Sequence, residues 1–317
     1  MTNKTILITG GTGSFGKEAI KQILPMNPAK LIIYSRDEFK QYELAEQYPE
    51  KDYPIHFVVG DVRDKDRLWR ALDGVGYVIH AAAMKQVPAC EYNPFEAIKT
   101  NVLGAQNLIE CAIDRKVKKV IALGTYKQVN PINLYGATKL CAEKLFIAAH
   151  MLPGDTCFSV VRYGNVMASR GSVVPYFYEC VEKRDPIPIT DWEMTRFWIT
   201  LPEAAQFVLQ SLERMAGGEI FVPMLRTIRI VDLAAAIGGK RYPCRISGIR
   251  PGEKIHEVLI SKDEVRLTRA VDGYFLIEPF SFPYKTTILT GEYESSRGGA
   301  RLTIPQIRGI LKKIAKG

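Results

Sequence analysis

Two side chains in this sequence have the types and the spacing for an alcohol redox step. Tyr135 and Lys139 are four residues apart in a segment with helical periodicity, so they lie on one helix face. An ammonium group beside a phenol lowers the pKa of the phenol, which can then take a proton from an alcohol as hydride leaves the same carbon. The pair is common by chance, so its meaning depends on the rest of the chain.

A glycine-rich turn follows the first strand-like segment directly and opens an amphipathic helical segment. Gly10 permits the tight turn, Gly13 lets the backbone approach a pyrophosphate, and Gly16 allows close helix packing. The first turn of the helix supplies N–H donors and positive potential to phosphates. In this context the turn predicts a dinucleotide site, with Gly10, Thr12, Gly13, Ser14, Phe15 and Gly16 contacting the cofactor.

The end of the second strand-like segment carries Ser35 and Arg36, where an NAD-specific site usually has an acidic residue that binds the ribose hydroxyls. A hydroxyl and a guanidinium suit a 2′-phosphate, so we expect NADP. Two alternatives stay open: Asp37 as the ribose partner, and Arg36 as a solvated charge. The other residues expected at the cofactor are Lys40, Asp61, Val62, Ala81, Ala82, Ala83, Tyr135 and Lys139.

These side chains must be positioned by a scaffold, and the first half of the chain alternates short apolar runs with amphipathic helical stretches. Strands are predicted at 5–9, 30–34, 56–59, 76–80, 120–123 and 158–161, and helices near 15–24, 38–48, 94–113 and 135–150. This alternation predicts an α/β fold with a doubly wound parallel (Rossmann) sheet. We expect an NADP-binding domain over 1–165, which also receives later segments, and a smaller C-terminal substrate-binding lobe over 166–317.

Composition limits the class of protein. The 317 residues are 47% hydrophobic and 24% charged, which is typical of a globular chain. Six scattered cysteines without a CxxC pair, and four histidines without metal-ligand spacing, predict no metal site. The net charge of +9 comes from dispersed Lys and Arg residues, so we expect no nucleic-acid partner. Without a leader sequence or a long apolar run, we expect a cytoplasmic protein that is not membrane-embedded.

Several blocks of sequence together resemble the extended short-chain dehydrogenase/reductase family. Residues 9–16, 81–83 and 135–139 resemble the family as a whole. A narrower resemblance, to UDP-N-acetylglucosamine 4,6-dehydratases of the inverting type, rests on HAAAMKQVP at 80–88, NPINLYGATK at 130–139, VRYGN at 161–165 and RPGEKIHE at 250–257. It covers residues 5 to about 280 and implies a homo-oligomeric enzyme of nucleotide-sugar and polysaccharide biosynthesis.

The resemblance implies a reaction cycle in one pocket. NADP oxidises C4 of the sugar, the C5 proton is removed, the C6 hydroxyl leaves, hydride returns to C6, and protonation of C5 from the other face inverts it. Tyr135 would be the redox base, Lys139 its partner, Lys127 the base at C5, and Thr125 the residue that holds a sugar hydroxyl. The implied substrate contacts are Lys85, Asn165, Thr195, Arg196, Arg250 and Glu253, the last five at the uridine diphosphate.

One position departs from the family pattern. The family has Ser-Thr-Asp-Lys where this chain has Gly124, Thr125, Tyr126 and Lys127, so a tyrosine replaces the acid expected to protonate the departing C6 hydroxyl. A phenol is protonated at neutral pH but is a weaker acid than a carboxyl. Three explanations stay open: a substitute acid, a mark of different chemistry, or an engineered or inactivating replacement.

The leading hypothesis is therefore an NADP-dependent UDP-N-acetylglucosamine 4,6-dehydratase (a lyase), with inversion at C5 left open. A second enzyme class is an NADP-dependent UDP-sugar 4-epimerase or 4-keto reductase, which needs Tyr135 and Lys139 but no acid at C6. The third is a non-catalytic nucleotide-sugar-binding homologue. The intact Tyr135–Lys139 pair argues against the third class, because nothing structural requires it.

Overall fold

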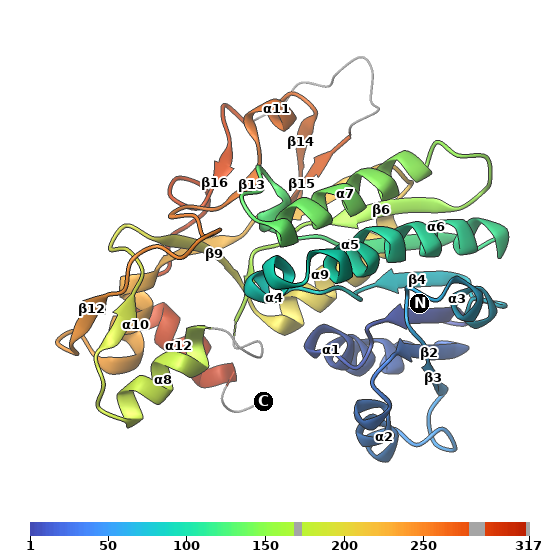
Figure 1. Ribbon diagram of the computed structural model, residues 1–317, viewed down its shortest axis with the longest axis horizontal. Helices are drawn as coiled ribbons and strands as arrows, with labels where there is room; N and C mark the ends of the chain where they lie inside the picture. Colours follow the sequence, from blue (N-terminus) through green and yellow to red (C-terminus); the bar gives the residue numbers. More distant parts are fainter. Residues whose placement is uncertain (168–172, 279–288, 315–317) are drawn as a thin grey trace.

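The computed structural model describes residues 1–167, 173–278 and 289–314, and the larger lobe of this part is built on a nine-stranded sheet (Figure 1). The strand order is β14-β15-β10-β6-β5-β4-β1-β2-β3, parallel from β3 to β10, with β15 and β14 antiparallel at one edge. The strands are β1 (Thr5–Thr9), β2 (Lys30–Ser35), β3 (Ile55–Val59), β4 (Tyr77–His80), β5 (Lys119–Leu123), β6 (Cys157–Val161), β10 (Ile220–Pro223), β14 (Thr268–Val271) and β15 (Tyr274–Ile277).

Helices cover both faces of this sheet. On one face α1 packs against α9, and on the other α6 packs between α3 and α7 (Figure 1). The helices of this lobe are α1 (Ser14–Ile23), α2 (Glu38–Gln47), α3 (Lys65–Ala71), α4 (Val87–Tyr92), α5 (Pro94–Ile98), α6 (Gly104–Asp114), α7 (Leu134–Ala149) and α9 (Leu201–Arg214), with short turns η1 (Leu24–Met26) and η3 (Tyr126–Gln128). The predicted doubly wound parallel sheet is confirmed.

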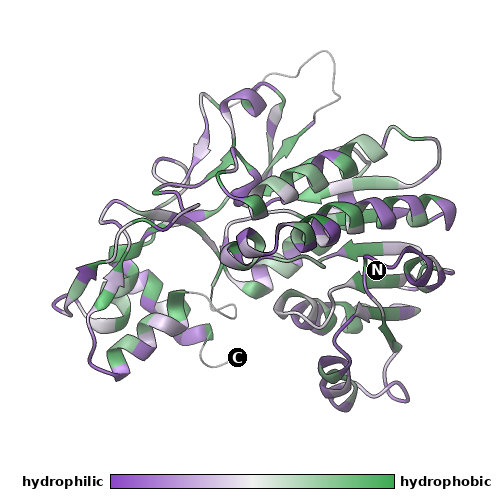
Figure 2. Ribbon diagram, in the orientation of Figure 1, coloured by the Kyte–Doolittle hydropathy of each residue, from purple (hydrophilic) through white to green (hydrophobic). Residues whose placement is uncertain are grey.

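Two apolar layers hold the sheet between the helices. Successive residues of a strand point to opposite faces, so Ile6 and Ile8 join the layer under α1 and α9, and Leu7 joins the layer under α6 and α7. All three side chains are fully buried. In Figure 2 the central strands are correspondingly green, whereas purple residues gather on the outer sides of the helices.

The smaller lobe is formed from chain beyond Tyr163. It contains a sheet of β11 (Arg226–Arg229), β9 (Thr195–Ile199) and β7 (Asn165–Val166), and the pairs β12–β8 and β13–β16. Its remaining elements are β8 (Ile187–Ile189), β12 (Cys244–Ile246), β13 (Val258–Ile260), β16 (Tyr293–Glu294), α8 (Val173–Glu182), α10 (Ile230–Gly238), α11 (Lys262–Val265) and α12 (Ile304–Ile314). Between segments of this lobe the chain returns to the central sheet through α9, β10, β14 and β15, so the C-terminal half serves both lobes.

The helix predicted over 94–113 is interrupted. A π-helical turn, η2 (Lys99–Leu103), separates α5 from α6. Inside it the buried Asn101 side chain bonds both the N–H and the carbonyl of Met84, at 2.8 and 3.0 Å, and the Thr138 hydroxyl at 3.0 Å. Turns of this type often mark functional regions. Here the turn fixes the loop after β4 against α7.

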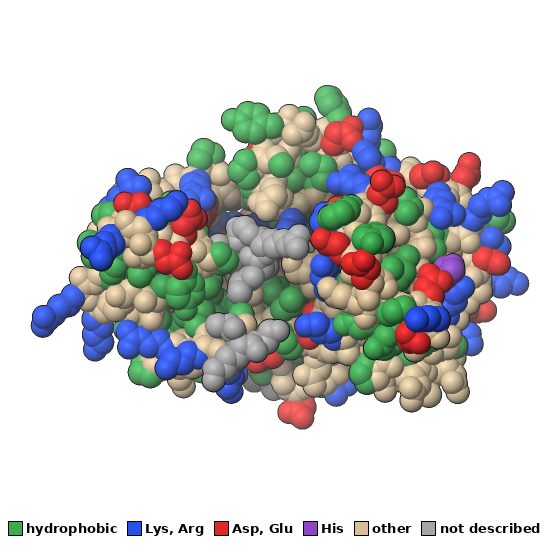
Figure 3. Space-filling view, turned by 90° about the horizontal axis from the view of Figure 1, so that it is seen from below, with side chains coloured by type: hydrophobic (Ala, Val, Ile, Leu, Met, Phe, Trp, Pro, Cys, Tyr) green, Lys and Arg blue, Asp and Glu red, His purple; other side chains and the backbone are tan. Residues whose placement is uncertain are grey.

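The described ranges contain no helix long and apolar enough to cross a bilayer, and no group of three or more His, Cys, Asp or Glu side chains placed for a metal ion. On the face seen in Figure 3, basic and acidic side chains are mixed over the surface.

Candidate active site

A cleft opens at the carboxyl ends of the parallel strands. Its first part, a cavity of about 530 Å³, is lined by residues that directly follow or end β1, β2, β4 and β5, including Gly10, Ser35, Ala81 and Gly124. Doubly wound sheets bind their ligands at this edge. A second cavity of about 670 Å³ shares Asn165 with the first and extends into the smaller lobe. One long molecule can therefore contact both lobes.

The glycine turn has the geometry of a pyrophosphate cradle. Gly10 has a positive φ of 66°, and a Cβ there would lie 2.9 Å from the backbone of Ala82. A Cβ on Gly16 would lie 2.1 Å from the carbonyl oxygen of Gly11, so α1 packs on the turn only if this residue is glycine. Gly13 precedes α1 at its N-cap, where the free N–H groups of the first turn face the cavity. The turn therefore fits a dinucleotide.

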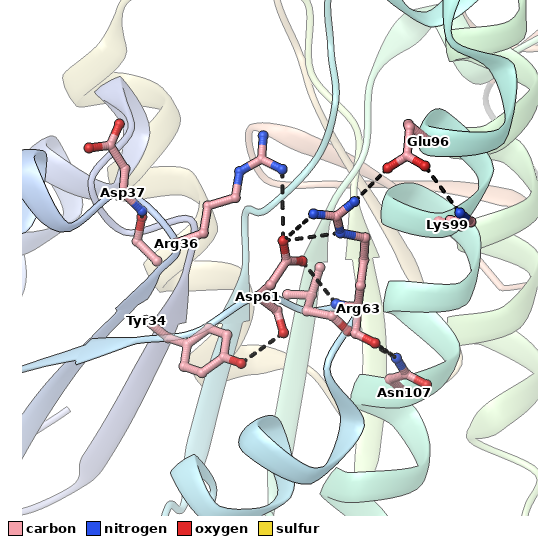
Figure 4. Close-up of polar contacts among 10 residues, drawn as sticks. Tyr34, Arg36, Asp37, Asp61, Arg63, Glu96, Lys99 and Asn107 are labelled. Carbon is pink, nitrogen blue, oxygen red and sulfur yellow. Dashed lines mark hydrogen bonds and ion pairs between the residues drawn. The ribbon is translucent and has the colours of Figure 1, made fainter.

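The far end of the first cavity holds a network of ions around Asp61 (Figure 4). Arg36 Nη1 lies 3.8 Å and Arg63 Nη2 lies 2.7 Å from Asp61 Oδ2. Arg63 Nη1 also pairs with Glu96 Oε2 at 2.5 Å. The Tyr34 hydroxyl donates to the Asp61 carbonyl at 2.9 Å. Arg63 is held by both Asp61 and Glu96, whereas Arg36 meets Asp61 only at 3.8 Å and is largely exposed, so the Arg36 guanidinium can still bind an anion.

Asp37, the alternative ribose partner, is used by α2. Its carboxylate caps the helix by accepting from the Lys40 N–H at 3.0 Å, and it also pairs with the Lys40 amine. In Figure 4 its side chain points away from Asp61, whereas Arg36 extends toward Asp61. The Ser35 hydroxyl lies 2.8 Å from the Thr12 hydroxyl inside the cavity. Ser35 and Arg36 therefore remain available to a ribose substituent, and Lys40, although its amine pairs with Asp37, has further N–H donors at the same cavity wall.

Tyr135 and Lys139 lie on the first turns of α7 and face the first cavity. Asn133 caps this helix by accepting from the Gly136 N–H at 2.8 Å, which fixes the start of the helix. Burial raises the pKa of Tyr135, and a hydrogen bond with the Thr125 side chain opposes that rise. Burial lowers the pKa of Lys139 to about 8. The hydroxyl, phenol and amine form one proton-handling group beside the cofactor cradle.

Tyr126 and Lys127 occupy η3 and line the same cavity. The Lys127 amine lies 4.9 Å from the centre of the Tyr126 ring. Burial lowers the pKa of Lys127, although the carboxylate of Glu257 opposes this effect. Burial, followed by Glu257, raises the pKa of Tyr126, and Arg196 and the Asn165 side chain oppose that rise. A more readily neutral amine can accept a proton, and a phenol that stays protonated can donate one.

A network of ion pairs, centred on the buried Arg162, lies behind the group formed by Thr125, Tyr135 and Lys139. Arg162 is 1% exposed and bonds Glu143 at 2.6 Å and Glu264 at 2.6 Å. Glu143 accepts from the Gln128 amide, and the Gln128 side-chain oxygen accepts from the Thr125 N–H at 3.0 Å. The network therefore ties η3 to α7 and to the chain around β13. No local pattern in the sequence predicts a role for Glu143, Arg162 or Glu264.

The structure brings most of the predicted residues together. The first cavity is lined by Gly10, Thr12, Gly13, Ser14, Phe15, Ser35, Arg36, Lys40, Asp61, Val62, Ala81, Ala82, Ala83, Lys85, Thr125, Tyr126, Lys127, Tyr135, Lys139 and Asn165. The second cavity adds Arg196, Arg250 and Glu253, with Arg196 Nη2 3.4 Å from Glu253 Oε1.

Two predicted residues lie elsewhere. Gly16 packs beneath the cradle, as its close approach to Gly11 requires. Thr195 is the neighbour of Arg196 on β9, so its side chain points to the other face of that strand. Its hydroxyl bonds the His256 ring at 2.8 Å and the Ser295 hydroxyl at 2.7 Å, in a separate cavity.

Two residues that sequence analysis did not single out contribute to the site. Tyr163 lines the first cavity, and Glu257 lies buried behind Lys127. Tyr163 belongs to the block VRYGN at 161–165, and Glu257 to the block RPGEKIHE at 250–257, on which the family resemblance rests. Their types carried no signal by themselves, because the direction of a side chain becomes known only when the lobes are placed together.

A glycine cradle on a doubly wound sheet, with Thr125, Tyr135 and Lys139 beside it and a second lobe closing the cleft, defines an extended short-chain dehydrogenase/reductase. The chain belongs to the polysaccharide biosynthesis protein family, whose model matches residues 6–279.

Individual relatives are similar over most of this chain. The inverting UDP-N-acetylglucosamine 4,6-dehydratase of Campylobacter jejuni is 53% identical over 281 residues, which cover 87% of this chain and 83% of the relative. The UDP-glucose 4-epimerase of Rickettsia prowazekii is 40% identical and covers 98% of this chain and 95% of the relative. Among solved structures, Pen from Bacillus thuringiensis has a TM-score of 0.89 at 36% identity, covering 98% of this chain and 99% of that one.

Proposed function

We propose that this protein is an NADP-dependent 4,6-dehydratase that acts on UDP-N-acetylglucosamine in nucleotide-sugar biosynthesis for surface glycans. The observation that carries the proposal is one cavity that holds both the Tyr135–Lys139 pair and the Lys127 amine, beside a dinucleotide cradle. The similarity to the Campylobacter jejuni enzyme supports the choice of sugar.

The choice of NADP is supported by the ribose end of the cavity. Ser35, Arg36 and Lys40 line it, and a 2′-phosphate would accept hydrogen bonds from all three. Asp37 also lines this cavity, but its carboxylate caps α2 and pairs with the Lys40 amine, which offsets its charge. The same residues would bind NAD less well, because its ribose hydroxyl offers no charge to Arg36 and Lys40.

The first step is oxidation at C4. Tyr135 takes the proton of the C4 hydroxyl, and Thr125 and Lys139 hold the phenol and its charge. Bound nicotinamide would accept the C4 hydride and later return hydride to C6. Burial raises the pKa of Tyr135, so a positive charge beside the phenol, which Lys139 would supply, is needed to favour the tyrosinate.

The second step is loss of water across C5 and C6. Once C4 is a ketone, the C5 proton is acidic, and Lys127 removes it as a neutral amine. The C6 hydroxyl leaves with a proton from Tyr126, whose phenol stays protonated because burial raises its pKa. A phenol is a weaker donor than the family's carboxyl, so we expect elimination to be slower than oxidation.

The nucleotide of the substrate would lie in the second cavity. Arg196 and Arg250 supply guanidinium groups for the diphosphate, and Glu253 supplies a carboxylate for ribose hydroxyls. Asn165 lines both cavities and marks the junction between sugar and diphosphate. The length of the cleft therefore matches a nucleotide sugar better than a free sugar.

We also propose that the protein is a homo-oligomer. The chain from α4 to η2 exposes Tyr92, Phe95 and Leu103 by 86%, 74% and 46%, and apolar side chains that gather on one exposed stretch are typical of an interface. A second copy of the chain would cover them. Light scattering at micromolar concentration tests this, and a monomer mass would contradict it.

Mass spectrometry of the reaction product tests the proposed activity. Purified protein with NADP and UDP-N-acetylglucosamine should give a product lighter by one water. Proton NMR of that product then gives its C5 configuration. Unchanged substrate in the presence of bound NADP would contradict the proposal.

A second candidate is a UDP-sugar 4-epimerase. Tyr126 in place of the family's acid favours it, because epimerisation at C4 needs Tyr135 and Lys139 but no donor at C6. The similarity to the Rickettsia prowazekii enzyme also supports it. This activity would give a C4 epimer of unchanged mass, so the product mass separates the two candidates, and proton NMR distinguishes the epimer from unreacted substrate.

A further inference from the structure

A buried carboxylate lies directly behind the cleft and has no role in the steps above. Glu257 is 1% exposed and lines neither cavity of the cleft. Its Oε1 atom has no hydrogen-bond partner among the described residues. The same atom lies 3.8 Å from Lys127 Nζ and 3.7 Å from Arg196 Nε. One carboxylate thus faces both the expected C5 base and an expected diphosphate contact.

The position of Glu257 is fixed by its own backbone. Its N–H donates to the Ser295 hydroxyl at 2.9 Å, and its carbonyl accepts from the Ser295 N–H at 2.8 Å. Two residues earlier, the Ile255 carbonyl accepts from the Thr195 N–H and from Arg196 Nη1. The Lys254 amine donates to the Val129 carbonyl at 2.8 Å, next to η3. The segment therefore bridges β9, β16 and the turn that carries Lys127.

We propose that Glu257 is a positioning residue that holds the Lys127 amine in the cleft and supports it as the base at C5. The proposal rests on the proposed function, since it assumes that Lys127 accepts the C5 proton.

The geometry favours this role over a purely structural ion pair. A structural ion pair, Arg162 with Glu143, is closed by hydrogen bonds at 2.6 and 2.5 Å, and both of its side chains are 1% exposed. The contacts of Glu257 to Lys127 and Arg196 are more than a full ångström longer, and Lys127 keeps 23% of its side chain exposed toward the cavity. A carboxylate at this distance stabilises an ammonium without occupying its donors, so the amine stays free to exchange protons with a ligand.

The charges around Lys127 and Glu257 decide whether loss of Glu257 would raise or lower the pKa of the Lys127 amine. Lys127 faces Glu257, Arg196 and Glu253, and Glu257 also faces Lys254 and the Tyr126 phenol. Burial lowers the pKa of Lys127, Glu257 raises it, and Arg196 lowers it. Removal of the Glu257 charge leaves Lys127 beside Arg196 with only Glu253 to compensate. The amine then becomes neutral at lower pH and is a weaker base.

Competitive acetylation of the amine measures this effect without any enzymatic activity. The intact protein with NADP is treated with trace acetic anhydride across a pH series, and labelling of Lys127 is read by peptide mass spectrometry. In Glu257→Gln the midpoint of labelling should move to lower pH by about one unit or more. Glu257→Asp, which keeps the charge but withdraws it by one methylene group, should give a smaller shift in the same direction. Coincident labelling profiles of the wild type and both variants would overturn the assignment.

A matched control is Glu219→Gln. Glu219 is also a buried carboxylate, bonded to Ser159 at 2.5 Å and to the Gly217 N–H at 2.7 Å, but it lies before β10 at the opposite edge of the sheet. Its variant should leave the labelling of Lys127 unchanged. An equal shift in this control would mean that the effect is general destabilisation, and would also overturn the assignment.

Steady-state kinetics supplies the second test. The acidic limb of the dehydration rate should move to lower pH in Glu257→Gln, and kcat should fall more than KM changes. Unaltered profiles in an active enzyme would count against Glu257. The two proposals can fail separately. A labelling shift in a protein that releases no water would support the effect of Glu257 on the Lys127 amine but contradict the dehydratase activity. Dehydration without a labelling shift would support the dehydratase activity but contradict the role of Glu257.

Discussion

Two groups of proton-handling side chains meet at η3, and they differ in how completely hydrogen bonds fix their positions. Tyr135 and Lys139 stand on a capped helix, with Thr125 tied through Gln128 to the buried ion network. Tyr126 and Lys127 stand on the turn itself. Behind them lies Glu257, whose Oε1 has no hydrogen-bond partner among the described residues.

The difference separates the two halves of the proposed chemistry. Hydride transfer at C4 depends on close placement of a phenol, an amine and a cofactor. The capped helix α7 and the hydrogen-bonded ion pairs around Arg162 provide this placement. Elimination depends on two proton transfers, for which the chain offers an amine and a phenol in place of an amine and a carboxyl. We therefore expect oxidation at C4 to tolerate substitutions around η3, and loss of water to be sensitive to single substitutions there.

The largest effect is expected at the redox group. Tyr135→Phe removes the only phenol of that group and should reduce both NADPH formation and dehydration by about 10³-fold. Single-turnover absorbance of NADPH measures the first, and product mass the second. Tyr77→Phe is the control, because Tyr77 begins β4 at the edge of the sheet opposite the cleft. Normal NADPH formation in Tyr135→Phe would remove this residue from the redox step.

The next largest effect is expected at Lys127, and it should separate loss of water from oxidation at C4. Lys127→Met keeps much of the side-chain volume but no base, so dehydration should fall by about 10²-fold or more while bound NADPH still forms. Lys119→Met is the control, since the Lys119 amine bonds the Leu212 and Glu213 carbonyls far from the cleft. An equal loss of both steps in Lys127→Met would mean that the two groups act as one unit.

A smaller effect is expected at the proton donor. Tyr126→Phe should lower dehydration by about tenfold or more if the phenol is the donor, with NADPH formation retained. Tyr126→Asp restores the family's carboxyl and should raise dehydration where the smaller side chain keeps its position. Unchanged dehydration in the phenylalanine variant would exclude Tyr126 as the donor.

The smallest effect concerns the cofactor. Arg36→Ala removes one charged contact to a 2′-phosphate, so the affinity for NADP should fall about tenfold and that for NAD much less. Calorimetric titration of both nucleotides measures the change. Arg70→Ala, an exposed arginine on α3, is the control. Equal affinity of the wild type for NAD and NADP would contradict the assignment.

Much of the nucleotide half was predictable because its signals are local. The turn at Gly10 to Gly16 and the Tyr135–Lys139 spacing each specify geometry within a few residues, and the structure places both at one sheet edge. The helix predicted over 94–113 was wrong in one respect, since the π turn at 99–103 depends on bonds from Asn101 to distant Met84 and Thr138.

The smaller lobe was less predictable because its site residues meet through long-range contacts. Arg196 and Glu253 come together across 57 residues of chain, and the carboxylate of Glu257 reaches Lys127 across a still longer separation. Thr195 shows the same limit: its type suits a ligand contact, but the pleat of β9 turns it away from Arg196. Such directions follow from tertiary packing and leave no trace in local sequence.

The fate of a deuterium label at C5 tests the central claim most directly. Wild-type protein, given NADP and UDP-N-acetylglucosamine deuterated at C5, should release water and lose the label to solvent. Lys127→Met should form NADPH and keep the label. Retention of the label by the wild type, or equal loss in both proteins, would contradict the assignment of Lys127 as the base for elimination.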